Sequence, residues 1–214
     1  DKTHYIVNGS KKWITSGTKA DYFTVAVRTG KKGMNGISML LLEKNMLGFN
    51  IRRIKTQGLW MSGTAYLSFY NVKVPICNLI GAENSGFKPL LKNFNHERFL
   101  MACISNRCSR LCLEESIKYA KQRQTFNKLL IKHQIIRHKL IEMIRLIETT
   151  HSYIEQIAYN YHYLSSNRLG GKIAMLKVQA TKTWEFCNRE ASQILGGASY
   201  TRSGKGQIIE RLYR

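Results

Sequence analysis

The change of hydrophobic period near residue 88 constrains the fold of this chain more than any other feature of the sequence. Before it, short runs rich in β-branched and aromatic residues, such as HYIV and DYFTVAV, alternate with the turn signals NGS, TGKKG and MSG. After it, apolar residues recur at the helical spacings of three and four. Closely spaced short strands are typical of an antiparallel sandwich or barrel. We therefore predict an α+β chain with a β-domain at residues 1–88 and a helical domain at residues 89–214.

Long amphipathic helices account for the second half of the chain. The apolar period places them at residues 86–122, 129–164 and 171–195. Because the joins between them are short, we expect neighbouring helices to run antiparallel as an up-and-down bundle. The sequence opens in what reads as mid-strand and stops at RLYR, so we expect both domains to be truncated, the β-domain at its start and the bundle at its end.

The formal charge of +21 comes from 34 Lys and Arg against 13 Asp and Glu. Such a charge favours an anionic partner, and nucleic acid is one class of anion. The basic residues are nevertheless scattered, and no block of like charges forms a basic tail. An anionic small ligand, an acidic partner and a lysine-rich composition without special function all remain open, and we do not expect nucleic acid to be the main partner.

The cysteines argue against a disulfide framework and against a metal site. There are five, an odd number, and none has CxxC spacing. Cys103, Cys108 and Cys112 lie at helical offsets on one segment, which suits small buried hydrophobes. We therefore predict a reducing compartment and no bound metal. No apolar run is long enough for a membrane span.

The stretch FNHERFL places a carboxylate in a predicted core helix. Apolar residues recur around it, and Glu97 falls on their stripe. The stripe consists of Phe94, Met101, Ile104, Cys108 and Leu111. A buried structural glutamate paired with Arg98 or with a neighbouring helix is one interpretation. A general base beside an apolar substrate is the other, and spacing alone does not separate them.

Further motifs are ambiguous when each is taken alone. KKWITSG at residues 11–17 can be edge packing followed by turn chemistry. In KQRQTFNKLL, Arg123 and Thr125 either contact phosphate oxygens or lie at a solvated helix end. In QILGGASYTRSGKGQ, Gly196 and Gly197 form a helix C-cap or allow close approach of a ligand to the main chain.

Taken together and in this order, these motifs resemble the acyl-CoA dehydrogenase family over essentially the whole chain. The resemblance is carried by NGSKKWITSG, YNVKVPICNLIGAENSGFK, the ER dipeptide, the Arg-x-Thr-Phe joint, HQIIRHKL, QILGGASYTRSG and IERLYR. It implies the middle β-domain and the C-terminal helical domain of that family. Two departures are the Phe126-Asn127-Lys128 joint, where the family usually has FGK, and QGLWMSG, which lacks a usual arginine.

The resemblance implies an FAD-dependent enzyme that dehydrogenates an acyl-CoA thioester in fatty-acid or branched-chain acyl catabolism. A carboxylate takes the α-proton while the β-hydrogen passes as hydride to flavin N5. Glu97 matches the base of the isovaleryl-CoA and long-chain acyl-CoA dehydrogenases, which lies in an ER dipeptide on the first helix of the bundle. In much of the family the base lies on a later segment. The alternatives are an acyl-CoA oxidase, a nitroalkane oxidase-like enzyme and a DNA-associated member.

The resemblance also implies where FAD would bind and which partners the enzyme has. Trp13, Thr15 and Ser16 would line the isoalloxazine; Arg123, Thr125 and Phe126 would contact the pyrophosphate and adenosine of a neighbouring subunit; Gln134, Gln193, Gly196 and Gly197 would lie close to the same dinucleotide. We expect a homodimer or homotetramer that passes electrons to electron-transfer flavoprotein or another acceptor. The cytoplasm is favoured over the mitochondrion as its location.

Overall fold

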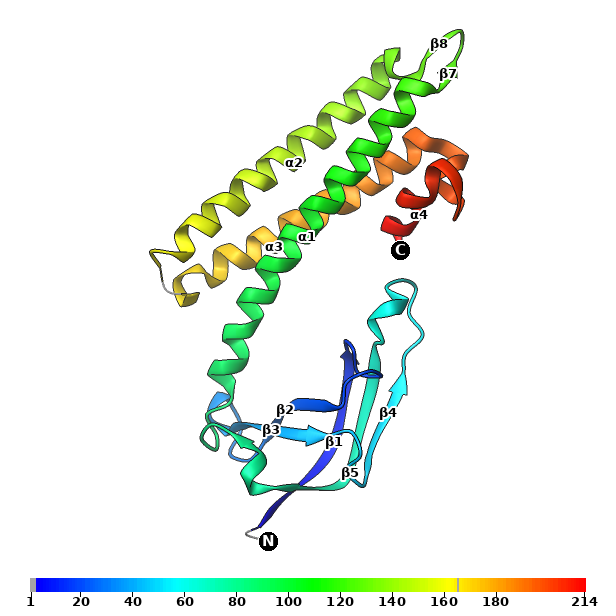
Figure 1. Ribbon diagram of the computed structural model, residues 1–214. Coiled ribbons are helices and arrows are strands. Elements are labelled where there is room, and N and C mark those ends of the chain that lie inside the picture. The colour runs from blue at the N-terminus through cyan, green and yellow to red at the C-terminus, as the bar shows by residue number, and fades with distance from the viewer. Residues whose placement is uncertain (1–2, 165) are drawn as a thin grey trace. The chain divides into compact units, whose positions relative to one another are not determined.

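The computed structural model describes residues 3–164 and 166–214. The chain divides into two compact units after Leu91 (Figure 1). The division falls inside the first helix, and the predicted boundary at residue 88 lies in the first turn of that helix.

The first unit contains two three-stranded sheets with antiparallel pairing throughout. One has the order β1-β5-β4 and the other β2-β3-β6. The strands are β1 His4–Ile14, β2 Tyr22–Arg28, β3 Ile37–Glu43, β4 Phe49–Arg53, β5 Ala65–Pro75 and β6 Leu79–Ile80. Short 3-10 turns lie between them at η1 Met34–Gly36, η2 Trp60–Ser62 and η3 Ile76–Asn78.

A single apolar core lies between the two sheets. Along β5, buried and less buried residues alternate, as expected of a strand with one covered face. Leu67, Val72 and Val74 of this strand pack with Leu40 and Leu42 of β3, and all five are nearly or fully buried. The predicted antiparallel β architecture of the first half is confirmed.

The second unit is a bundle of three long helices, α1 to α3, in which consecutive helices run antiparallel (Figure 1). The elements are α1 Phe87–Gln122, β7 Gln124–Thr125, β8 Lys128–Leu129, η4 Leu130–Lys132, α2 Gln134–Tyr161, α3 Ser166–Leu195, η5 Gly196–Tyr200, η6 Gly204–Gly206 and α4 Gln207–Tyr213. Met143 and Ile147 of α2, Leu176 of α3 and Ile209 of α4 are fully buried. None of the helices between residues 3 and 164 or between 166 and 214 combines the length and hydropathy of a membrane span.

Two predicted helix starts are wrong. α2 begins at Gln134 rather than at residue 129, because Lys128–Leu129 pairs with Gln124–Thr125 as a small hairpin. α3 begins before the Gly170–Gly171 pair rather than at it. Leu169 is fully buried and anchors this first turn, and a Cβ on Gly170 would lie 3.4 Å from the side chain of Asn95 on α1.

The packed face of α1 also differs from the prediction. The predicted apolar stripe is partly exposed, with Phe94 at 37%, Met101 at 40% and Ile104 at 43%. The buried face instead carries small residues: Ala102, Ser105, Asn106, Ser109, Cys112, Ser116 and Ala120. Each buried serine of this face donates to the carbonyl four residues earlier in its own helix. Burying these hydroxyls therefore leaves no donor unsatisfied.

Candidate functional site

Trp13 lies in a β-bulge near the end of β1. The register against β5 shifts between Lys11 and Ile14, and Trp13 takes a left-handed backbone conformation with φ 66°. This conformation is a rare and strained one for a bulky residue, and bulges of this kind re-aim side chains at functional sites. The indole is 62% exposed, so its ring is available to a ligand within this unit.

The turn that follows β1 brings Thr15 and Ser16 next to Trp13. Both residues are exposed, and Ser16 also has positive φ, at 58°. Among the residues that the structure describes, neither hydroxyl makes a hydrogen bond. An exposed aromatic ring beside two uncommitted hydroxyls suits a flat ligand with polar edge atoms. The first unit therefore brings these three predicted residues together.

The β7–β8 hairpin forms the join between α1 and α2. Its loop residues Phe126 and Asn127 both have positive φ, at 50° and 59°, as a type I′ turn requires. Asn127 thus adopts the conformation that a glycine would supply, and asparagine tolerates it better than most residues. Phe126 projects with 90% of its surface exposed. The hydroxyl of Thr125 lies 3.0 Å from Nε2 of His133, which fixes the base of the hairpin.

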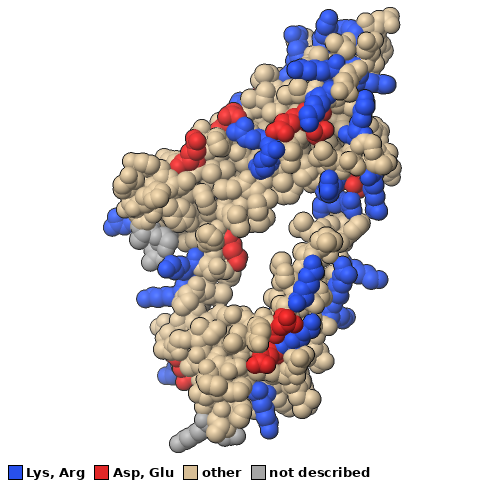
Figure 2. Space-filling model, viewed as in Figure 1, with Lys and Arg blue, Asp and Glu red and all other residues tan. Residues whose placement is uncertain are grey.

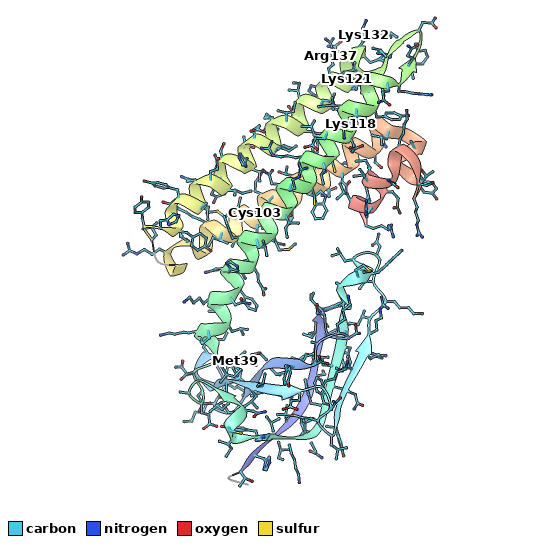
Figure 3. The ribbon with its side chains drawn as sticks, in the orientation of Figure 1. Met39, Cys103, Lys118, Lys121, Lys132 and Arg137 are labelled. Carbon is cyan, nitrogen blue, oxygen red and sulfur yellow. The ribbon has the colours of Figure 1, made fainter. Side chains whose placement is uncertain are left out.

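Basic side chains surround this hairpin, and we call them the basic end. They are Lys118, Lys121, Arg123, Lys128, Lys132 and Arg137. Figure 3 shows four of them around the α1–α2 junction, and in Figure 2 Lys and Arg gather over the same part of the helical unit. Lys118 is paired with Glu115 at 2.7 Å. The other side chains of the basic end have no carboxylate partner among the described residues, so this end favours an anionic ligand.

The end of α3 presents an open segment of main chain. Gly196 follows the last residue of the helix with φ 57°, the usual geometry of a C-terminal cap. A Cβ on Gly196 or Gly197 would meet no heavy atom of the described residues within 4 Å. Gln193 is exposed one turn earlier. A hydrogen bond from Lys205 Nζ to Gln122 Oε1, 3.1 Å long, ties the following turn to the end of α1.

The residues predicted for the dinucleotide therefore gather at one end of the helical unit. Arg123, Thr125, Phe126 and Gln134 belong to the hairpin and the first turn of α2. The Gly196–Gly197 pair lies at the same end of the bundle (Figure 1). Lys121, Lys132 and Arg137 were not predicted as site residues, because they are scattered in the sequence and converge only through the antiparallel helix pair.

Glu97 lies near the other end of α1, on an exposed position of the partly apolar face. Its Oε1 accepts a hydrogen bond of 2.7 Å from the side-chain amide of Asn93. Among the described residues it has no ion-pair partner. The guanidinium of Arg98 instead lies 5.9 Å from the ring centroid of Phe94. Within the helical unit, Glu97 is therefore not a buried structural carboxylate paired with Arg98.

The distance between Glu97 and the hairpin decides whether one ligand can contact both within a single copy of the chain. At the helical rise, the 26 residues from Glu97 to Arg123 correspond to about 39 Å along α1. An extended flavin dinucleotide is shorter than this. A single molecule bound at Glu97 therefore cannot also reach the hairpin of the same copy.

Comparison with known proteins identifies relatives of both units. The family described as acyl-CoA dehydrogenase, middle domain, matches residues 1–72, and acyl-CoA dehydrogenase, C-terminal domain, matches residues 84–214. The acyl-CoA dehydrogenase AFT10-1 of Alternaria alternata is 42% identical over 217 residues, which cover 99% of this chain and 50% of that protein. The mitochondrial long-chain specific acyl-CoA dehydrogenase of Sus scrofa is 32% identical over 205 residues, covering 94% of this chain and 47% of that protein.

A solved structure has the same fold. The crystal structure of an acyl-CoA dehydrogenase from Geobacillus kaustophilus superposes with a TM-score of 0.91 at 30% identity. The match covers 100% of this chain and 56% of that one. The chain thus spans about half the length of the relatives that it matches.

Proposed function

The chain belongs to the acyl-CoA dehydrogenase family, and from this premise we propose that it forms part of an FAD-dependent enzyme that dehydrogenates an acyl-CoA thioester. The observation that carries the proposal is an exposed carboxylate without an ion-pair partner, Glu97, on a partly exposed apolar helix face. An acyl chain needs an apolar surface, and removal of its α-proton needs a base beside that surface.

The residues present fit FAD in each unit. In the first, the strained and exposed Trp13 and the hydroxyls of Thr15 and Ser16 would face the isoalloxazine. In the second, the open main chain at Gly196 and Gly197 leaves space that a Cβ would fill, and the basic end would balance a diphosphate. Bound FAD would supply the acceptor for the β-hydrogen of the substrate, which leaves as hydride.

Glu97 would take the α-proton of the acyl-CoA onto a carboxylate oxygen. Because no Lys or Arg among the described residues pairs with it, its charge is not neutralised by an ion pair. The amide of Asn93 holds Oε1 and leaves Oε2 free of described hydrogen-bond partners. We propose that Oε2 is the oxygen that accepts the proton.

A second copy of the chain would complete each cofactor site. The distance of about 39 Å between Glu97 and Arg123 supports this, since it exceeds the length of one dinucleotide. The exposed Phe126 and the basic end would then contact the FAD whose substrate is served by the Glu97 of another subunit. The active assembly would be a homodimer or homotetramer. Electron-transfer flavoprotein or another acceptor would reoxidise it.

The test is to express the full-length parent protein and record its visible spectrum. Bound FAD gives a yellow protein, and anaerobic addition of short, long and branched acyl-CoA thioesters should bleach it, the strongest response indicating the substrate class. Absence of bound flavin, or a flavin that no acyl-CoA bleaches, contradicts the proposal. Oxygen consumption without an added electron acceptor would instead identify an oxidase.

A further inference from the structure

The loop Leu59–Gly63, which precedes β5, is held by hydrogen bonds rather than by apolar packing, and these include Trp60 Nε1 to Thr56 O at 2.9 Å and Ser62 Oγ with Thr64 Oγ1 at 2.8 Å. Leu59 and Gly63 have positive φ, at 50° and 59°, and enclose the short turn η2. The side chains of Leu59 and Met61 are 78% and 84% exposed. Their packing within the first unit therefore contributes little to the position of this loop.

The carbonyl groups of this loop hold the turn that carries Thr15 and Ser16. The Ser16 N–H donates to Ser62 O at 2.6 Å, and the Thr18 N–H donates to Gly63 O at 3.2 Å. The Thr18 hydroxyl donates to the same Gly63 carbonyl at 3.3 Å. Lys19 Nζ donates to Met61 O at 2.8 Å. All four donors lie on the turn, and the acceptors are three main-chain carbonyls of the loop, those of Met61, Ser62 and Gly63.

The strand that follows the loop supports the same turn from its buried side. A Cβ on Gly17 would lie 2.7 Å from Cβ of Ala65, the first residue of β5, which is fully buried. The turn therefore has no room to move toward the core, and the loop carbonyls hold its other side.

We propose that the loop Leu59–Gly63 is a positioning element for the flavin-facing turn, which it holds through the carbonyls of residues 61–63. This inference rests on the proposed function, because it takes Thr15 and Ser16 to face the flavin. The hydroxyls of these two residues have no partner among the described residues, so the main chain alone decides where they lie. The left-handed conformation of Ser16 is unfavourable by itself, and the bond to Ser62 O holds it there.

No substitution removes a main-chain carbonyl, so the test has to disturb the contact between the loop and the turn. Gly63 is the position at which an added side chain does this. In Gly63→Ala, the new Cβ would lie 2.6 Å from Thr18 Oγ1, so Thr18 on the turn or residue 63 on the loop has to shift. Gly81→Ala is the matched control. Gly81 also has positive φ, at 76°, in the same unit, but a Cβ there would meet no described heavy atom within 4 Å.

The first measurement is amide hydrogen exchange of the full-length protein freed of flavin. Gly63→Ala should accelerate exchange at the Ser16 and Thr18 amides by about fivefold to tenfold, the effect of losing a hydrogen bond. Gly81→Ala should leave both amides at the wild-type rate. Adding Thr18→Ala to Gly63→Ala removes the colliding Oγ1 and should restore protection at Ser16.

The second measurement is the visible spectrum and FAD affinity of the same variants as holoenzymes. Gly63→Ala should shift the flavin absorption bands and raise the Kd for FAD by about tenfold, whereas Gly81→Ala should lower thermal stability without shifting the bands.

Unchanged exchange at Ser16 in Gly63→Ala would overturn the positioning role. Changed exchange with an unaltered flavin spectrum would overturn the link between the turn and the flavin. A wild-type protein that binds no FAD refutes the proposed function, while the exchange measurement still decides whether the loop positions the turn.

Discussion

Glu97 has a single neutral donor, the side-chain amide of Asn93, as the partner of its carboxylate. Glutamine at this position keeps the shape and can still accept from Asn93, but it cannot take a proton. We therefore expect Glu97→Gln to bind FAD normally and to slow reduction of the flavin by acyl-CoA by about 10²–10⁴-fold, the usual contribution of a general base. Stopped-flow spectrophotometry under anaerobic conditions measures this rate.

Glu114→Gln is the matched control for this variant. Glu114 also lies on α1, but its carboxylate pairs with Arg107 at 2.8 Å on the surface. Its replacement should leave flavin reduction at the wild-type rate. If Glu97→Gln also reduces its flavin at the wild-type rate, another carboxylate of the full-length protein is the base.

The cysteines provide a second prediction at the scale of the residue. Burial raises the pKa of the Cys187 thiol to about 12, and burial also raises the pKa of Cys112. At pH 8 a group with that pKa is thiolate in only about one molecule in ten thousand, and the thiolate is the reactive form. Iodoacetamide at pH 8 should therefore modify the exposed Cys77 first and leave Cys112 and Cys187 unmodified until the protein unfolds. Mass spectrometry of timed samples reads the order, and early labelling of Cys187 would contradict the burial.

Individual site residues differ in how far the sequence could identify them. Trp13, Thr15 and Ser16 are consecutive or nearly so, so a local motif brings them into one turn. The support of that turn was not predictable, because its acceptors are carbonyls of residues 61–63 and every residue type has a carbonyl. The exposed and unpaired state of Glu97 also depends on which face of α1 packs, and this is a property of the whole bundle.

A single substitution tests whether the exposed Phe126 of the β7–β8 hairpin contacts the cofactor. Phe126 is 90% exposed, so Phe126→Ala should change the free energy of unfolding by less than about 0.5 kcal/mol. Loss of an aromatic ring that stacks on a base costs about 1–3 kcal/mol of binding. We expect the Kd for FAD to rise by about tenfold or more, as measured by fluorescence titration of the apoenzyme.

Tyr159→Ala on α2 serves as the control for the hairpin variant. Tyr159 is also an exposed aromatic residue, at 65%, but it lies near the C-terminal end of α2, away from the hairpin. Its loss should leave FAD binding unchanged. Equal affinities of the two variants for FAD would show that Phe126 does not contact the cofactor.

At the scale of the elements, hydrophobic period located the helices but selected the wrong face of α1. Large apolar residues such as Phe94, Met101 and Ile104 recur at helical spacing along one face, but this face is partly exposed. The packed face instead carries small residues, and Ser105 and Ser109 can be buried there because each hydroxyl bonds to a carbonyl of its own helix. The hairpin was missed for a similar reason, since two-residue strands have no period to detect.

At the scale of the whole molecule, the charge of +21 has a local consequence at the basic end. If this end attracts the diphosphate of FAD, binding should weaken as salt rises, because ions screen the attraction within about 10 Å at 0.1 M. Replacing Lys121, Lys132 and Arg137 by glutamine should lower FAD affinity at low salt and flatten its salt dependence. Titrations at several salt concentrations measure both effects.

The control for the salt experiment removes the same number of positive charges from another part of the chain. Lys31, Lys32 and Lys73 are exposed residues of the first unit, and their replacement by glutamine removes three charges without touching the basic end. This variant should retain the wild-type salt dependence. Equal flattening in both triple variants would show that total charge, and not the basic end, governs FAD binding.

The assembly itself is tested by mixing two inactive subunits. Glu97→Gln removes the base, and Arg123→Ala removes the hairpin cation that would hold the partner's cofactor. In a mixed dimer, the flavin served by the intact Glu97 receives the intact Arg123 of the other subunit, whereas the second flavin has both defects. Random pairing of equal amounts gives half mixed dimers, each with one intact site, so we expect about a quarter of the wild-type activity per site.

If each hairpin served the flavin of its own subunit, both sites of a mixed dimer would be defective and coexpression would restore nothing. The separation of about 39 Å along α1 favours the first result, because it places Glu97 and Arg123 beyond the reach of one cofactor.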